Sequence, residues 1–307
     1  MTPAGGALDE VPAGVLSELE PVRAAARRWP AILGAVLTLA MVAGLGRELF
    51  GRGLAGLSRS VPADPRFYLC FMLLYLSLPT GDFVIFRRLW GIPAAGFAAL
   101  LKKRIANEVV FGYSGEAYFY AWAKARSAMV AAPFGAVKDV SILSALAGNV
   151  ITLAMIAVAL PLGRDLLDEG QFDTLVGSTV VVVAITLPWL LLSRRVFSLP
   201  RARLWWVFGV HCLRLLAGSV LIALAWHFAL PSVSIGMWLF LAAGRLLVSR
   251  LPLVPNKDLI FANVAILLIG QDRALSELVA FTAALTLVAH IALIAAFGLA
   301  LLWRKRS

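Results

Sequence analysis

Long apolar runs separated by short polar connections dominate this chain of 307 residues. A helix needs about 20 apolar residues to cross roughly 30 Å of hydrocarbon. Apolar runs of suitable length predict spans at about 29–45, 66–86, 142–162, 174–193, 206–228, 232–248 and 277–303. A further run, about 251–270, contains two prolines and the polar residues Asn256, Lys257 and Asp258, so it predicts a broken span.

The region 91–141 is too polar for an ordinary span and too apolar for a solvated loop. Gly112 and Gly115 permit a tight bend within it, which favours a re-entrant hairpin. The broken run 251–270 occupies a corresponding place in the second half, as in transporters that bind substrate between paired interruptions. The pattern predicts an all-α polytopic membrane protein with about eight transmembrane helices and two re-entrant or broken segments.

The polar ends of the chain frame a single transmembrane domain at 29–303. Residues 1–28 carry four acids before their first Arg, which predicts a retained cytoplasmic or interfacial segment rather than a signal peptide. Residues 304–307 form a basic tail. Arg and Lys gather there and in the connection 194–203, and the positive-inside rule then predicts an inner-membrane protein with both termini cytoplasmic.

Composition supports a membrane protein and narrows its partners. Hydrophobic residues make up 61% of the chain, and the mean hydropathy is +0.88. The net charge of +11 lies largely in the flanks, where topology and attraction to anionic lipids explain it without a nucleic-acid partner. Cys70 and Cys212 lie in separate apolar runs, so we expect no disulfide, metal site or cofactor.

Arg214 is the most deeply placed charge in the predicted spans. It follows Trp205 by nine residues, about 13 Å along a helix, which places it near the bilayer centre. A buried Arg requires a carboxylate or a phosphate, and Glu116 or Glu108 is the expected partner. Two roles stay open for Arg214, a structural ion pair and a phosphate-binding site.

Four other charged residues allow a plainer interpretation. Arg245 is close to the cytoplasmic end of its span and is expected to snorkel to the interface. Lys257 and Asp258 suit either a cytoplasmic turn or a polar groove. Asp82 follows Pro79 and Gly81 and is expected to be a solvated loop carboxylate.

Two short motifs resemble those of a known family, the flippase-like membrane proteins related to the transmembrane region of lysylphosphatidylglycerol synthetase. Asn107 followed by residues 111–116, Phe-Gly-Tyr-Ser-Gly-Glu, resembles the family's Asn and Pro-Gly-Arg-X-Gly-Glu signature. The segment from Pro255 through Asn263 to Gly270 is similar to its second motif. The resemblance implies lipid handling. Lysyl transfer is not expected, because it belongs to a soluble synthetase domain that these residues do not resemble.

A phosphate-bearing headgroup meets a large desolvation cost in hydrocarbon, and a polar groove between helices would lower it. The expected substrate-binding residues are Asn107, Glu108, Tyr113, Glu116, Arg214, Arg245, Lys257, Asp258 and Asn263. These features predict a protein that binds or translocates an amphiphilic lipid, whether phospholipid, glycolipid or polyprenyl-linked.

Two alternatives remain at this stage. The first is a non-transporting membrane subunit of an envelope lipid or polysaccharide assembly, with partner proteins from that assembly. The second, less favoured, is an intramembrane transferase. The chain has neither a Gly-X-Ser-X-Gly nor a His-Glu-X-X-His motif, so no catalytic residue is expected.

Overall fold

A computed structural model gives the arrangement of most of the predicted membrane domain. It describes residues 61–109, 114–124, 133–163, 177, 180, 184, 197–250, 256–269 and 273–306. The predicted N-terminal segment 1–28 and the predicted span 29–45 lie outside these ranges. So does the predicted span 174–193, apart from three isolated residues.

The described residues form α-helices of two kinds, long and short. The long helices are α4 (Pro65–Trp90), α7 (Pro133–Gly163), α9 (Arg201–Ala229) and α12 (Arg273–Arg306). The short helices are α5 (Ala95–Val109), α6 (Ser114–Lys124), α10 (Ile235–Val248) and α11 (Lys257–Ile269). Each half of the order therefore consists of a long helix, two short helices and a second long helix.

The long helices fit an α-helical membrane protein of several passes. Four segments are long and apolar enough to cross a bilayer: Pro65–Trp90, Gly135–Ala159, Arg201–Ala229 and Ala274–Ala300. The all-helical membrane class predicted from the sequence is confirmed at this level. The predicted number of eight transmembrane helices stays a prediction, because two of the predicted spans lie outside the described residues.

Three predicted boundaries differ from the structure. The expected span 232–248 is the 14-residue helix α10, about 21 Å long and too short for a full crossing. The region 91–141 divides earlier than expected, because Pro133 begins α7, leaving α5 and α6 as two short helices. The basic residues 304–306 continue α12 instead of forming a separate tail.

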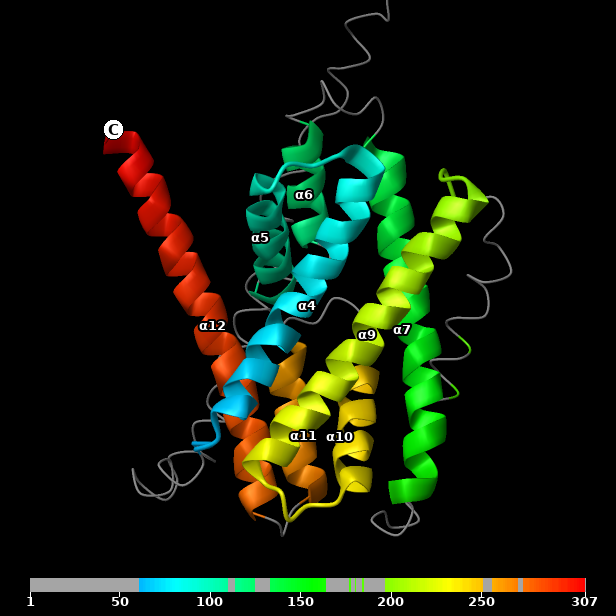
Figure 1. Cartoon of the computed structure of the whole chain (residues 1–307), viewed down its shortest axis with the longest axis vertical. Coiled ribbons are helices and arrows are strands. Elements are labelled where there is room, and N and C mark those ends of the chain that lie inside the picture. Colours follow the sequence, from blue (N-terminus) through cyan, green and yellow to red (C-terminus); the bar gives the residue numbers. More distant parts are fainter. Residues whose placement is uncertain are drawn as a thin grey trace, which may run out of the picture.

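The two pairs of short helices lie at opposite ends of the bundle (Figure 1). Helices α4 and α9 run antiparallel and pack against each other between them. The C-terminal ends of α5 and α10 face each other, and the two pairs of short helices contact where the Asn256 amide donates to the Glu108 carbonyl at 2.7 Å. Since the chain direction is reversed between the halves, they form an inverted pair.

Local sequence explains where several helices begin and end. Asp64 caps α4 by accepting a hydrogen bond from the Arg66 amide at 2.8 Å, and Gly91 ends it with a left-handed φ of 64°. The Arg66 side chain also hydrogen bonds to Asp64 and lowers the pKa of that carboxyl. Ser234 caps α10 by accepting from the Met237 amide.

Aromatic residues fill the core at both ends of the bundle. Phe119 on α6 packs against Phe86 on α4, with ring centroids 4.6 Å apart. At the other end, Trp226 on α9 contacts Trp238 on α10, and its indole donates to Thr282 of α12 at 3.1 Å. Each pair of short helices is therefore packed against long helices. The short helices do not have to be stable on their own, because this packing stabilises them.

Gly115 allows the α5–α6 hairpin to close tightly. Its amide donates to Asn107 Oδ1 at 2.7 Å, and Ser114 donates to the Ala106 carbonyl at 2.7 Å. A Cβ added at Gly115 would overlap the Lys103 carbonyl. The Lys103 carbonyl belongs to the backbone of α5, which cannot move aside as the end of a flexible side chain can. A larger residue at position 115 would therefore force α5 and α6 apart.

We expect Gly115→Ala to lower the free energy of unfolding by about 1–3 kcal/mol, the usual cost of overpacking. Gly209→Ala is the matched control, because nothing lies within 4 Å of an added Cβ there and Ala favours a helix. Thermal unfolding in detergent would measure both. Equal melting temperatures for the two variants would contradict the close packing of the hairpin.

Candidate functional site

A cavity of about 550 Å³ lies among α4, α5, α6, α7, α9, α10 and α11. Its size is within the roughly 300–1,000 Å³ typical of small-molecule sites. Its wall includes four carboxylates and six basic residues: Asp82, Glu108, Glu116, Asp258, Lys103, Arg104, Arg214, Arg245, Arg250 and Lys257. So many charges inside a bundle of apolar helices require specific pairing.

Most of the residues expected at a substrate site meet at this cavity. Those that line it are Asn107, Glu108, Glu116, Arg214, Arg245, Lys257 and Asp258. Asn263 is not among the lining residues, and its amide donates to the Leu259 carbonyl of its own helix at 2.8 Å. Tyr113 lies outside the described residues. The structure also adds Asp82, Lys103, Arg104 and Arg250, which were not predicted.

Asp82, Lys103 and Glu116 form one charge cluster. Lys103 Nζ donates to Asp82 Oδ2 at 2.8 Å and lies 3.4 Å from Glu116 Oε1. Asp82 is 4% exposed, so the expected loop carboxylate was wrong. The reason is that Pro79 and Gly81 lie inside α4 and do not end it.

Pro79 creates the acceptor that holds Arg104. Proline has no amide hydrogen, so the carbonyl four residues earlier, that of Tyr75, has no helical donor. Arg104 Nη1 of α5 donates to this carbonyl, and its guanidinium lies 4.1 Å from the Tyr75 ring centroid. The proline within an apolar run was a signal in the sequence for an unpaired carbonyl, but the donor, Arg104, is 29 residues from Tyr75 and could not be identified from spacing.

Arg214 projects from α9 without a carboxylate partner. Its Nη2 donates to Ser144 Oγ at 3.1 Å and lies 3.3 Å from His211 Nδ1. No carboxylate of the described residues is within 4 Å of it, so the expected pair with Glu116 or Glu108 was wrong. Gly81 leaves room for the side chain, since an added Cβ would lie 2.6 Å from Arg214 Cδ.

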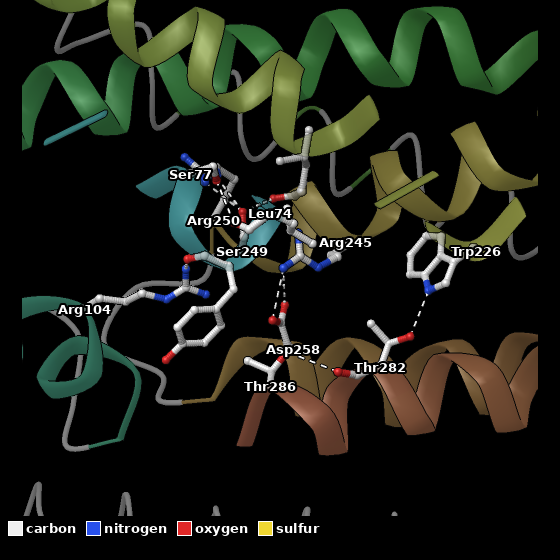
Figure 2. Close-up of polar contacts among 12 residues, drawn as sticks. Leu74, Ser77, Arg104, Trp226, Arg245, Ser249, Arg250, Asp258, Thr282 and Thr286 are labelled. Atoms are coloured by element: carbon white, nitrogen blue, oxygen red, sulfur yellow. Dashed lines mark hydrogen bonds and ion pairs between the residues drawn. The ribbon is translucent and has the colours of Figure 1, made fainter. Parts of the chain in front are cut away.

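The second hairpin contains its own ion pair. Arg245 donates to Asp258 Oδ2 at 3.0 Å and lies 2.9 Å from Oδ1, and Figure 2 shows the two side chains pointing toward each other. The expected snorkelling of Arg245 was therefore wrong. Lys257 Nζ donates to the Ser249 carbonyl at 2.9 Å, and a Cβ on Gly148 would overlap the Arg250 guanidinium.

The two hairpins use the same ionic arrangement. In each, a cation on the first short helix pairs with a carboxylate in the first turn of the second, as Lys103 with Glu116 and Arg245 with Asp258. A carboxylate at a helix N-terminus is also favoured by the helix dipole. These pairs connect the arms of each hairpin beside the cavity.

Asp139 of α7 has a structural contact away from the cavity. It is fully buried and accepts hydrogen bonds from the Ser198 and Leu199 amides at 2.6 and 2.7 Å. These contacts hold the segment that precedes α9 against α7. Among the described residues, no three His, Cys, Asp or Glu side chains gather into a group that could hold a metal ion.

We expect Asp82→Asn to lower the free energy of unfolding by about 3–5 kcal/mol, because it leaves a buried Lys103 with a weaker partner. The double variant Asp82→Asn, Lys103→Gln should recover part of that loss. Asp64→Asn is the control, because its partner Arg66 is exposed and Asn also caps helices. Chemical unfolding in detergent would test this, and a single variant as stable as the control would contradict it.

Comparison with known proteins adds no family to this geometry. No family model, curated protein or solved structure matches the chain. A function has to be argued from the cavity and its charges.

Proposed function

We propose that the protein binds the headgroup of an amphiphilic lipid in this cavity and carries it between the leaflets of the membrane. The observation that supports the proposal most strongly is a cavity with ten charged residues on its wall, which lies between three helices of membrane-spanning length and the two pairs of short helices. Charged residues inside a membrane domain are costly and usually mark a path for a polar substrate.

The proposal treats α5–α6 and α10–α11 as re-entrant hairpins. Their helices have 15, 11, 14 and 13 residues, about 16–22 Å at 1.5 Å per residue, so they would end inside a 30 Å layer. The contact between the Asn256 amide and the Glu108 carbonyl would then lie near the middle of the bilayer. Transporters with inverted halves bind their substrates at this depth, between broken helices.

The cavity would lower the cost of moving a headgroup through hydrocarbon. Asn107, Ser144 and Asn149 provide neutral polar groups on its wall, and the charged residues provide both signs. A headgroup leaving water could exchange its hydration for these contacts. The acyl or prenyl chains would stay in the surrounding lipid.

The family resemblance stays a prediction, as do the inner-membrane location and the cytoplasmic termini. Asn107, Gly115 and Glu116 carry the resemblance, and they lie together at the first hairpin. Their position beside the cavity agrees with the lipid transport that the resemblance implies. A scaffold subunit would need no such cavity. An intramembrane transferase would need a nucleophile or an activated water, and the described contacts single out neither.

A leaflet assay in reconstituted vesicles tests the proposal. Fluorescent phospholipid and polyprenyl-phosphate probes would be followed with wild type, Glu116→Gln and Arg214→Ala. We expect wild type to move at least one probe and each variant to slow it about tenfold or more, the cost of a lost charged hydrogen bond. Glu116→Gln should still fold, because Lys103 keeps its bond to Asp82.

Arg66→Gln is the control for this assay, because Arg66 is exposed, lies outside the cavity and pairs with Asp64. It should move lipid at the wild-type rate. If wild type moves no probe, the scaffold function replaces transport. If both cavity variants retain full activity, the cavity is not the path.

A further inference from the structure

The cavity wall has more positive than negative formal charge. Among the residues that the structure describes, six basic residues of the wall face four carboxylates, an excess of two positive charges. Buried charge without compensation is strongly unfavourable, so the site would be stabilised by a ligand that supplies the missing negative charge. This excess indicates the chemistry of the ligand.

Three of the cations have no carboxylate within 4 Å among the described residues: Arg104, Arg214 and Lys257. Arg104 and Lys257 donate to backbone carbonyls, and Arg214 donates to a serine hydroxyl. The Arg214 Nε is buried and has no hydrogen-bond partner among the residues that the structure describes. Neutral acceptors satisfy these donors but do not reduce the excess of positive charge on the wall.

Several of these cations are near enough to repel one another. Arg214 interacts unfavourably with Lys103 and Arg104. Asp82 attracts Arg214 as well, but its carboxylate hydrogen bonds to Lys103. On the second hairpin, Arg250 repels Lys257, while Glu108 and Glu116 attract it without forming a direct pair. An anion in the cavity would relieve this repulsion.

We propose that the ligand headgroup is a phosphate monoester, held in the cavity by Arg214 and Lys257 from opposite halves of the fold. This inference rests on the proposed lipid function and names its substrate class. A monoester carries about −1.5 to −2 charge at pH 7, close to the excess of the wall, whereas a phosphodiester carries about −1. Its three acceptor oxygens also suit the planar fork of an Arg.

The test uses the purified full chain in nanodiscs of phosphatidylcholine. The probes are phosphatidate and polyprenyl monophosphate as lipid monoesters, phosphatidylglycerol as a diester, and inorganic phosphate as a soluble monoanion or dianion. Ligand-induced increase of the melting temperature gives a half-saturating concentration for each. We expect the monoester lipids to bind about tenfold or more tightly than phosphatidylglycerol.

Two variants test whether Arg214 and Lys257 bind the phosphate monoester. Arg214→Gln and Lys257→Gln should each weaken monoester binding about tenfold or more and remove the preference over phosphatidylglycerol. Lys257→Gln keeps the test valid if Arg214→Gln fails to fold, because within the described part of the chain the Lys257 side chain hydrogen bonds to a backbone carbonyl and to no other group. Arg66→Gln should bind as wild type does.

Equal affinity for monoester and diester lipids, or unchanged binding in both variants, would overturn the inference. If inorganic phosphate binds as tightly as the lipids, the site recognises a phosphate group but its ligand is soluble. That result would contradict a lipid ligand. Selective binding without movement between leaflets would refute the proposed transport and leave the site. Lipid movement without any monoester preference would refute this inference and leave transport.

Discussion

Charge placed inside a bundle of apolar helices has to be compensated within the protein, and this constraint explains most of the described architecture. Lys103 holds Asp82 and Glu116 across three helices, and Arg245 holds Asp258 within the second hairpin. Removing Asp82 would leave the buried Lys103 without its hydrogen-bonded carboxylate partner. The short helices therefore stay close to α4 and α9 for electrostatic as well as apolar reasons.

Small residues and a proline make this compensation possible. Gly81 and Gly148 leave space for the side chains of Arg214 and Arg250. Pro79 removes one helical hydrogen bond, and the Tyr75 carbonyl then accepts from Arg104. In isolation these residues suggest breaks in a helix, but each one accommodates a specific cation from elsewhere in the fold.

The inverted halves reach the same arrangement with different residues. Each has a hairpin between two long helices and an ion pair across its arms, although the sequences show no residue-level repeat. The hairpins contact through the Asn256 amide and the Glu108 carbonyl. A cavity with excess positive charge remains beside that contact.

Much of the fold could be predicted from apolar run length, and much of the site could not. The four long helices and the interruption before Lys257 follow from hydropathy and proline placement. The span at 232–248 was overestimated because an apolar run alone does not distinguish a full crossing from a short hairpin arm. The partners of Arg214 and Glu116 depend on how two hairpins pack, and spacing along one chain does not encode that distance. Asp82 was missed for a local reason, since the residues before it suggest a turn.

Solvent access to the cavity is the most direct test of this account. Ser144 lines the cavity from α7, whereas Val158 on the same helix is 59% exposed on the outer surface of the bundle. Single cysteines would be placed at these positions in a chain lacking Cys70 and Cys212, and vesicle-embedded protein would be treated with a small charged thiol reagent. The account expects modification of the cysteine at 144 and protection at 158 by lipid. Protection at both positions would contradict a polar, water-accessible cavity in the membrane domain.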